Sequence, residues 1–494
     1  MGIGKQIEQI AQEHPDKAAL IFKNNFITYD AFYQSICHIQ KHLLYIGDTK
    51  RPQKVAVLIG NEPAFLEVFF AVVTLGWTAI PFDPKWSERE AAQVMSKAEA
   101  DIYLKSKQFT EYAPYMVDAA YDIEEIKATP IIGDSLPPWN VHTSEHFYLG
   151  FTSGSTGSPK GFIRNHTSWL ESFKAGEEAF QYGRDDVIMA PGPLCHSLSL
   201  FGAIHALHMG ATFHLTTTFS ASSILSHLRK GCTSVLYAVP TMLQSLMQHL
   251  TKPIKRKITF LSSGAKLDSR LRHKLGNAFP ESIIYEYYGA SELSYVSFSS
   301  EELSSKYPGS VGKPFPGVQI TVRNSNGEPV PNGNIGKIYI ESDFLFDGYV
   351  HEPEETKKVL TDFGANIEDL GWMNDEGVLT IVGREKNMMI SGGLNVFPEE
   401  IEKVMKEKDT VKEAIVIGIQ DEYWGQKVIA LIQWKGKAYP DSLHLHCKQR
   451  LASYKVPKAF YEIEAFPYTS TGKIARKEIE MKWRDLINEY TCNC

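Results

Sequence analysis

The segment Tyr148–Gly161 constrains this chain most, and it reads Tyr-Leu-Gly-Phe-Thr-Ser-Gly-Ser-Thr-Gly-Ser-Pro-Lys-Gly. The apolar residues up to Phe151 are typical of the end of a buried strand. The seven residues that follow are only Thr, Ser and Gly, which cannot build a core but can turn backbone N–H groups inward around an anion. Lys160 adds a compact positive charge. The segment therefore predicts a phosphate-binding loop, although its Ser/Gly richness alone would favour a flexible linker. Because Pro159 precedes Lys160, it is not the Gly-Lys-Ser/Thr loop of nucleotide hydrolases.

Composition limits the other classes of function. The 494 residues suffice for two to four domain-sized units, and the net charge of −7 argues against a general nucleic-acid-binding surface. The start of the chain has no apolar signal region. The most apolar stretch, Val68–Ile80, is shorter than the roughly 20 residues that a membrane span needs, and we interpret it as a buried helix ended by Pro81. None of the six cysteines forms a Cys-x-x-Cys pair, so neither a zinc site nor a disulfide framework is expected, and a cytoplasmic location is the default.

The order of apolar segments predicts an α/β fold. Strands are expected at Ala18–Phe22 and Lys54–Ile59, and helices after Thr28 and over Pro63–Gly76, an alternation typical of a parallel sheet. From Pro308 onward, short strands separated by Gly, Pro and Asn indicate a small β-barrel.

Four later motifs stand in order behind the loop. They are Tyr285–Glu292 (Tyr-Glu-Tyr-Tyr-Gly-Ala-Ser-Glu), Asp369–Trp372 (Asp-Leu-Gly-Trp), Gly383–Asn387 and Thr471–Ile474 (Thr-Gly-Lys-Ile). Together with the loop, this series resembles the adenylate-forming superfamily of acyl-CoA synthetases, peptide-synthetase adenylation domains and luciferases. The chain is most similar to a bacterial fatty acyl-CoA synthetase, with matches from about residue 150 to residue 475.

The resemblance implies an α/β fold in which a large N-terminal region holds two α/β subdomains plus a small β-barrel, followed by a mobile C-terminal α+β domain. Two domains are expected. Residues 1–384 form the domain that binds AMP and carries out the adenylation, and residues 385–494 form a mobile domain that rotates about Lys386. In the family, Asp369 follows a glycine, and here Glu368 replaces it, so a different local turn is an open alternative.

The resemblance also assigns the site residues. Lys473, Glu292, Thr152 and His196 are expected to be catalytic, and Thr152 and Glu292 to contact Mg²⁺. The residues expected to bind nucleotide or coenzyme A are Thr152, Ser153, Gly154, Ser155, Thr156, Gly157, Lys160, Gly264, Ala265, Tyr288, Gly289, Ser291, Asp369, Arg384, Lys386, Gly392 and Gly393. Tyr288 offers a flat face for adenine and Glu292 a hard oxygen ligand.

The residue after His196 bears on the substrate. Amino-acid-activating relatives place an Asp here to pair with the substrate ammonium, whereas this chain has Ser197. An unpaired ammonium in a buried pocket is costly, so an amino-acid substrate is disfavoured. The expected reaction is ATP-dependent activation of a medium- or long-chain fatty acid as acyl-AMP, followed by transfer to coenzyme A with release of AMP and pyrophosphate.

Several alternatives stay open at this point. The acid could be aromatic, like succinylbenzoate, the acceptor could be a carrier protein, the adenylate could be oxidised as in luciferases, or the chain could be a catalytically idle nucleotide sensor. Retention of Lys473 and Glu292 argues against the sensor. The expected partners are the carboxylic acid, ATP with Mg²⁺, and coenzyme A, without nucleic acid or a membrane span, and a homodimer is left open.

Overall fold

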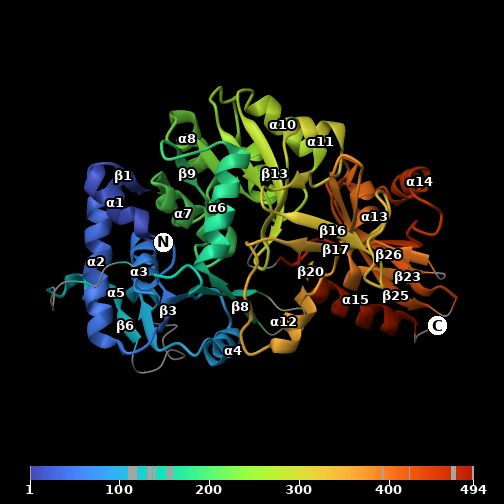
Figure 1. The fold of residues 1–494 in the computed structure, drawn as a ribbon. Coiled ribbons are helices and arrows are strands. Elements are labelled where there is room, and N and C mark those ends of the chain that lie inside the picture. Colours follow the sequence, from blue (N-terminus) through green and yellow to red (C-terminus); the bar gives the residue numbers. More distant parts are fainter. Residues whose placement is uncertain are drawn as a thin grey trace. The chain divides into compact units, whose positions relative to one another are not determined.

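The computed structural model describes residues 2–109, 120–130, 136, 139, 141–152, 159–391, 394–421, 423–468 and 474–491 (Figure 1). The chain divides into two compact units. The first contains residues 1–320 and 340–365, and the second contains residues 321–339 and 366–494. The predicted boundary after residue 384 lies inside the second unit and stays a prediction.

The first unit contains a nine-stranded sheet. Its strand order is β15 (Lys313–Pro314), β14 (Ser294–Ser299), β13 (Ile283–Ala290), β12 (Thr259–Ser262), β11 (Val235–Ala238), β9 (Val187–Met189), β10 (Thr212–Leu215), β1 (Ala18–Phe22) and β2 (Asn25–Thr28). The strands from β13 to β1 in this order are parallel to their neighbours, whereas β14, β15 and β2 are antiparallel edges. The predicted parallel sheet is thus confirmed.

A second sheet of seven strands lies in the same unit. Its order is β18 (Gly348–Tyr349), β8 (Lys160–Asn165), β7 (His146–Thr152), β4 (Thr78–Pro81), β3 (Lys54–Leu58), β5 (Ile102–Lys105) and β6 (Ala120–Asp122). The interpretation of Val68–Ile80 as one helix was wrong. The helix ends at Thr74, left-handed Gly76 (φ 76°) turns the chain, and β4 begins at Thr78.

Helices cover both sheets. They are α1 (Lys5–Glu13), α2 (Tyr29–Ile46), α3 (Pro63–Thr74), α4 (Glu88–Ala98), α5 (Ile123–Ala128), α6 (His166–Phe180), α7 (Ser197–Met209), α8 (Ala221–Lys230), α9 (Pro240–His249), α10 (Ser269–Ala278), α11 (Glu301–Lys306) and α12 (Pro353–Val359). Either Thr28 or Asp30 could cap α2 on sequence grounds, and Thr28 does so by accepting a hydrogen bond from Ala31 N at 3.2 Å. Helix α6 contacts β8 of one sheet and β14 of the other, so it joins the two layers (Figure 1).

Short antiparallel strands follow these two sheets in the chain, as predicted from the frequent Gly, Pro and Asn residues after Pro308. They are β16 (Gln319–Arg323), β17 (Gly336–Glu341), β19 (Leu360–Thr361), β20 (Gly364–Ala365), β21 (Asp369–Met373) and β22 (Leu379–Arg384), and the division between the units passes through β16 and β17. In the second unit, β17 pairs with β21 and β21 with β22.

The rest of the second unit is an α+β fold. Its elements are the 3₁₀ turn η2 (Glu385–Asn387), β23 (Met389–Ser391), β24 (Leu394–Val396), α13 (Pro398–Lys406), β25 (Val411–Asp421), β26 (Gly425–Trp434), α14 (Pro440–Arg450), β27 (Ala459–Glu462) and α15 (Arg476–Thr491). Alternate residues of β25 face opposite sides. Val416 packs in a core with α13 and α14, whereas Ile417 packs in another with Ile479 of α15. In the described part of the chain, no helix is both long and apolar enough to cross a bilayer.

Candidate active site

The carboxyl ends of parallel strands gather the first group of predicted residues. Strands β9, β11, β12 and β13 are parallel neighbours, so the segments that follow them lie at one edge of the sheet. His196 precedes α7 after β9, Gly264 and Ala265 are exposed after β12, and the turn Gly289–Glu292 ends β13. Ligands of open α/β sheets bind at this edge. The adenine role of Tyr288, a partly exposed residue of β13, stays a prediction.

The predicted phosphate loop connects two antiparallel strands. Thr152 at the end of β7 and Lys160 at the start of β8 are directly paired, so the loop is a hairpin connection. The predicted residues Ser153, Gly154, Ser155, Thr156 and Gly157 lie outside the described residues.

The Lys160 ammonium already has an anionic partner. Lys160 Nζ lies 2.6 Å from Glu355 Oε2, and the hydrogen bonds from Lys160 and from Lys358 lower the pKa of the Glu355 carboxyl to about 2. An incoming phosphate must therefore compete with Glu355 for this lysine.

We expect Glu355→Gln to strengthen ATP binding. Partly exposed ion pairs contribute up to about 1 kcal/mol, so freeing Lys160 should lower KM for ATP about two- to fivefold. Initial rates at varied ATP concentration measure this. Glu354→Gln, which removes a carboxylate of the same helix that pairs with Lys357, is the control and should leave KM unchanged. A KM that rises in Glu355→Gln would contradict the competition.

Tyr349 joins the loop to the Tyr285–Glu292 motif. Its hydroxyl donates to Glu292 Oε1 at 2.8 Å, and Lys160 Nζ lies 5.2 Å from the centre of its ring. Burial, together with the nearby Glu292 charge, raises the pKa of Tyr349 above its usual value, so the phenol stays a donor. The sequence signal for Tyr349 was only a Gly-Tyr dipeptide, which is too common to mark a site by itself.

Arg164, which the sequence analysis did not predict, contacts the backbone of the same turn. This β8 guanidinium is fully buried and donates to Ser291 O at 3.1 Å, Glu292 O at 3.2 Å and Phe344 O at 2.6 Å, and it also contacts Ser294 Oγ. Burial lowers the pKa of Arg164 to about 10, so it remains charged at neutral pH. The arginine fixes the backbone that carries Glu292.

The chemistry of the donors at Glu292 fits a magnesium ion. Among the described residues, Tyr349 is the hydrogen-bond partner of the Glu292 carboxylate. It engages Oε1, which leaves Oε2 for a hard cation. The Thr152 hydroxyl at the end of β7 is partly exposed. Both side chains supply the oxygen ligands that Mg²⁺ prefers.

Gly289 is required by a close backbone approach. A Cβ atom placed on Gly289 would lie 2.0 Å from Ser294 O on the facing strand β14. The strand pair has an irregular register at this point, between Tyr288 and Gly289. The tight turn that presents Glu292 therefore tolerates no side chain at this position.

We expect Gly289→Ala to destabilise the first unit by about 1–3 kcal/mol and to impair activity further by displacing Glu292. Denaturant unfolding together with activity per folded molecule would measure both effects. Gly183→Ala is the control, because nothing lies within 4 Å of an added Cβ there. Wild-type stability and activity in Gly289→Ala would show that the turn can adjust.

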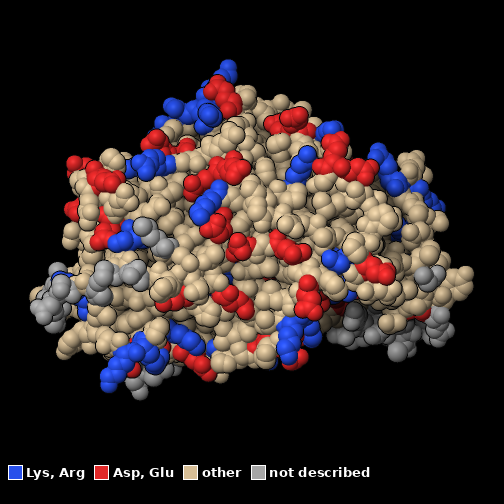
Figure 2. Space-filling model, viewed as in Figure 1, with Lys and Arg blue, Asp and Glu red and all other residues tan. Residues whose placement is uncertain are grey.

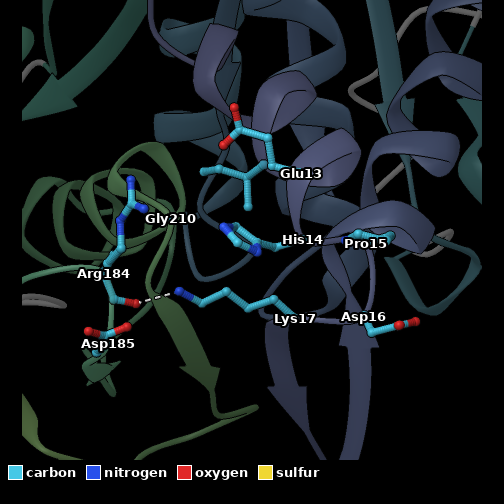
Figure 3. Close-up of a pocket in the computed structure, with 9 residues that line it drawn as sticks. Glu13, His14, Pro15, Asp16, Lys17, Arg184, Asp185 and Gly210 are labelled. Carbon is cyan, nitrogen blue, oxygen red and sulfur yellow. Dashed lines mark hydrogen bonds between the residues drawn. The ribbon is translucent and has the colours of Figure 1, made fainter.

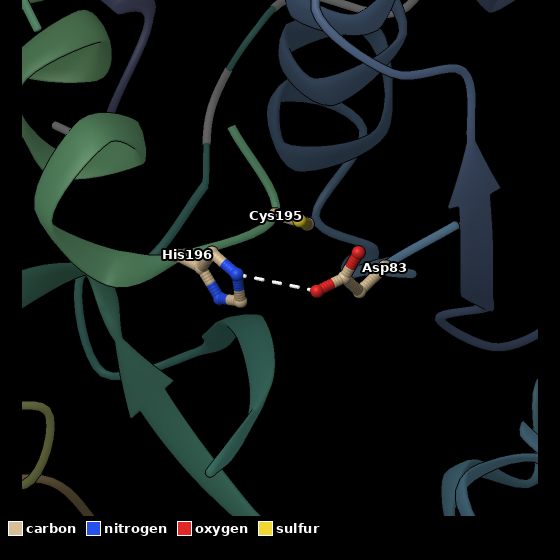
Figure 4. Close-up of side chains that lie close together, drawn as sticks. All are labelled: Asp83, Cys195 and His196. Carbon is tan, nitrogen blue, oxygen red and sulfur yellow. Dashed lines mark ion pairs between the residues drawn. The ribbon is translucent and has the colours of Figure 1, made fainter. Parts of the chain in front are cut away.

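His196 lies against a buried carboxylate. His196 Nε2 is 3.2 Å from Asp83 Oδ2, and Cys195 lies beside them (Figure 4). Burial alone would raise the pKa of Asp83, but His196 and the backbone N–H of Lys85 hold it below its ordinary value. Burial raises the pKa of the Cys195 thiol well above its usual range, so the thiol is protonated and is a poor nucleophile.

The hydroxyl of Ser197 is engaged in a small network. Ser197 Oγ lies 3.1 Å from Ser291 Oγ, and Ser197 also bonds to the buried Tyr148 hydroxyl. The segment that contains His196 and Ser197 is thereby linked directly to the Tyr285–Glu292 motif. Ser197 brings no carboxylate to this position.

In the second unit, Asp369 and Arg384 are register partners on β21 and β22, and Arg384 Nε donates to Asp369 Oδ1 at 3.0 Å. Glu368 has a left-handed backbone (φ 67°), a conformation that the glycine of the family would adopt easily at this position. Lys386 lies in the turn η2, with Nζ 3.8 Å from Glu368 Oε2. The ribose and hinge roles stay predictions.

Three predicted residues of the second unit, Gly392, Gly393 and Lys473, lie outside the described residues. The chain next to Lys473 is anchored by Arg476, which donates to Val416 O at 2.7 Å and pairs with the buried Glu402. The sequence alone does not reveal this role of Arg476, because burial cannot be read from a charge run.

A separate pocket of about 620 Å³ contains none of the predicted residues. It is lined by Ile10, Glu13, His14, Pro15, Asp16, Lys17, Arg184, Asp185 and Gly210, and Lys17 Nζ donates to Arg184 O at 2.7 Å across it (Figure 3).

On the face seen in Figure 2, acidic and basic side chains are interspersed without a large basic field.

Comparisons with known proteins now identify the class. The family described as AMP-binding enzyme matches residues 7–350, and the AMP-binding enzyme C-terminal domain matches residues 400–473. YhfT of Bacillus subtilis, by name an uncharacterised acyl–CoA ligase, is 38% identical over 99% of this chain and 100% of its own length. VraA of Staphylococcus epidermidis, provisionally named a long chain fatty acid–CoA ligase, is 30% identical over 97% of this chain and 98% of its own length.

The chain therefore belongs to the AMP-binding enzyme family and is an AMP-forming acyl-CoA ligase, as the motifs predicted. Its fold is similar to that of o-succinylbenzoate–CoA synthetase (MenE) from Bacillus subtilis, solved with an acyl-adenylate. The two align with a TM-score of 0.89 and 24% identity, over 96% of this chain and 97% of that one. The predicted combination of a large N-terminal α/β region and a C-terminal α+β domain is confirmed.

Proposed function

We propose that this ligase activates a medium- or long-chain fatty acid with ATP and transfers the acyl group to coenzyme A in the cytoplasm. The observation that carries the nucleotide half is the junction at Tyr349. This residue brings Lys160, which closes the phosphate loop, and Glu292, the proposed magnesium ligand, onto one side chain. Residues from three distant parts of the sequence thus supply cation, carboxylate and hydroxyl at one place.

In the first half-reaction, the substrate carboxylate attacks the α-phosphorus of ATP, and pyrophosphate leaves. Lys160 and the backbone of its loop hold the departing phosphates, and Glu292 and Thr152 would hold Mg²⁺, which neutralises phosphate charge when bound. Lys473 stabilises the charge that develops at the α-phosphate. His196, kept in place by Asp83, lies beside the substrate carboxylate.

In the second half-reaction, the thiol of coenzyme A attacks the acyl-adenylate, and AMP leaves. Rotation about Lys386 withdraws Lys473 and brings Gly392 and Gly393, which have no side chains, beside the pantetheine arm. The nucleophile belongs to the substrate, which agrees with the protonated thiol of Cys195.

The fatty-acid assignment is supported by the surroundings of Ser197. An amino-acid substrate needs a carboxylate for its ammonium, but the Ser197 hydroxyl is bonded to Ser291 and Tyr148, and Asp83 already faces His196. A buried ammonium without a partner would cost several kcal/mol. The provisional name of VraA also favours a long-chain fatty acid.

The test is isotope exchange between pyrophosphate and ATP over a panel of acids, namely octanoate, palmitate, o-succinylbenzoate and several amino acids. We expect exchange with an aliphatic acid and, on addition of coenzyme A, one thioester per AMP released. Strong exchange with an amino acid would refute the assignment. Exchange confined to o-succinylbenzoate would replace the fatty acid by an aryl acid within the same reaction class.

A further inference from the structure

Three different metal-ligating side chains converge where the connection after β4 meets the segment before α7. Asp83, Cys195 and His196 each offer one ligand atom, and these atoms all lie within 4.8 Å of one another (Figure 4). His196 Nε2 and Asp83 Oδ2 are 3.2 Å apart. A search of the described residues for three or more His, Cys, Asp or Glu side chains whose ligand atoms lie this close together returns this group.

Two of these ligand atoms lack a good hydrogen bond. Asp83 Oδ2 and His196 Nε2 are buried and lie 3.2 Å apart, but neither has a hydrogen-bond partner of proper geometry in the described part of the chain. The other Asp83 oxygen is engaged, since it accepts from Lys85 N at 2.9 Å. Buried polar atoms are nearly always satisfied, so this pair needs an additional partner.

The donor set favours zinc over magnesium. Thiolate, imidazole and carboxylate are the ligands of Zn²⁺, whereas Mg²⁺ demands oxygen. Zinc–ligand bonds of about 2.0–2.3 Å at tetrahedral angles place ligand atoms about 3.3–3.8 Å apart. The 3.2 Å contact nearly meets this spacing, and a pair as wide as 4.8 Å would have to close by about 1 Å on binding. We propose that Asp83, Cys195 and His196 bind Zn²⁺ and that its binding inhibits the enzyme.

Zinc binding releases one proton from Cys195. The Cys195 S–H bond breaks, a Zn–S bond forms, and the proton leaves to solvent, because zinc requires the thiolate. The Lys85 ammonium opposes a second cation, but the Asp83 carboxylate and the new thiolate together offset the charge of the ion. Three protein ligands leave a fourth position for water. The search for Cys-x-x-Cys spacing missed this site, because its ligands come from separate segments and only two are adjacent in sequence.

The inhibitory part rests on the proposed function, since it assumes that His196 lies beside the substrate carboxylate. A zinc ion would occupy His196 Nε2 and pull the side chain toward Asp83 and Cys195. Adenylation should then fail even at saturating Mg²⁺. Zinc binding itself does not depend on the proposed reaction and is measured separately.

The experiment uses the full-length chain with Cys492→Ser and Cys494→Ser as the background, because that terminal pair could take up zinc on its own. After metal removal, Zn²⁺ is titrated in competition with a chromophoric chelator in excess Mg²⁺. Co²⁺ is then substituted as a spectroscopic probe. The test variants are Cys195→Ser and His196→Asn, and the matched control is Cys232→Ser, a partly buried cysteine outside the cluster.

We expect one equivalent of Zn²⁺ in the background and in Cys232→Ser. Affinity should be weaker by more than about 100-fold in Cys195→Ser and His196→Asn, since losing even an outer partner of a ligand costs 10–100-fold. Bound Co²⁺ should show a thiolate charge-transfer band that is absent only in Cys195→Ser. Zinc should inhibit pyrophosphate exchange in the background and not in Cys195→Ser.

Failure to bind an equivalent of zinc, or binding that Cys195→Ser leaves unchanged, would overturn the site. Binding without inhibition would overturn the inhibitory role. If the background shows no acid-dependent exchange at all, the proposed function fails, but the chelator titration and the cobalt band still decide whether the site exists.

Discussion

Lys473→Ala should lower the rate of adenylation by about 10²–10³-fold and leave the attack of coenzyme A on a preformed acyl-adenylate nearly unchanged. Only the first half-reaction passes through attack at the α-phosphorus, whereas coenzyme A attacks the acyl carbon, so a cation aimed at the α-phosphate chiefly accelerates the first step. Lys473 itself lies outside the described residues. The chain on either side is tied together, because Tyr468 pairs with Ile474 and Ala475 N donates to Pro467 O at 2.9 Å.

Single-turnover measurements of each half-reaction separate these effects, and thermal unfolding checks the fold. Lys477→Ala is the matched control, because Lys477 is exposed one turn further along, at the start of α15. It should keep both rates. Equal losses of both half-reactions in Lys473→Ala would refute the division of labour between the two steps.

The elements that the sequence predicted well are those defined by local patterns. The strand before the loop and the start of α2 after Thr28 both follow from apolar periodicity and end signals in the chain itself. The one apolar segment that was misread, Val68–Ile80, is apolar throughout, and such a run cannot distinguish a buried helix from a buried strand.

The motifs located the predicted site residues, but not the contacts that hold them. The partnership of Lys160 with Glu355, and of Glu292 with Tyr349, joins residues far apart in sequence, and only the folded sheet order brings them together. Glu368 is instructive in another way. The replacement of the family's glycine left a different turn open, and the structure holds this non-glycine residue in the left-handed region, at a modest cost in strain.

Arg164→Met should destabilise the first unit by about 3–5 kcal/mol, the range measured when one member of a buried charged network is removed. The substitution keeps much of the side-chain volume but removes a buried charge and takes a donor from the carbonyl of Ser291, whereas Glu292 O still accepts from Phe346 N and Phe344 O from Ser294 Oγ. Each unsatisfied buried acceptor costs about 1–3 kcal/mol. The remaining folded protein should also lose adenylation activity, because the backbone that presents Glu292 is no longer fixed.

Denaturant unfolding gives the change in stability, and pyrophosphate exchange per folded molecule gives the change in activity. Arg89→Met on the exposed face of α4 is the matched control and should stay within about 0.5 kcal/mol of the wild type. A loss below about 1 kcal/mol in Arg164→Met would mean that water or a shifted strand satisfies the Ser291 carbonyl, and that the arginine is not what holds the turn. A stable variant that lost only its activity would show instead that Arg164 positions Glu292 without supporting the fold.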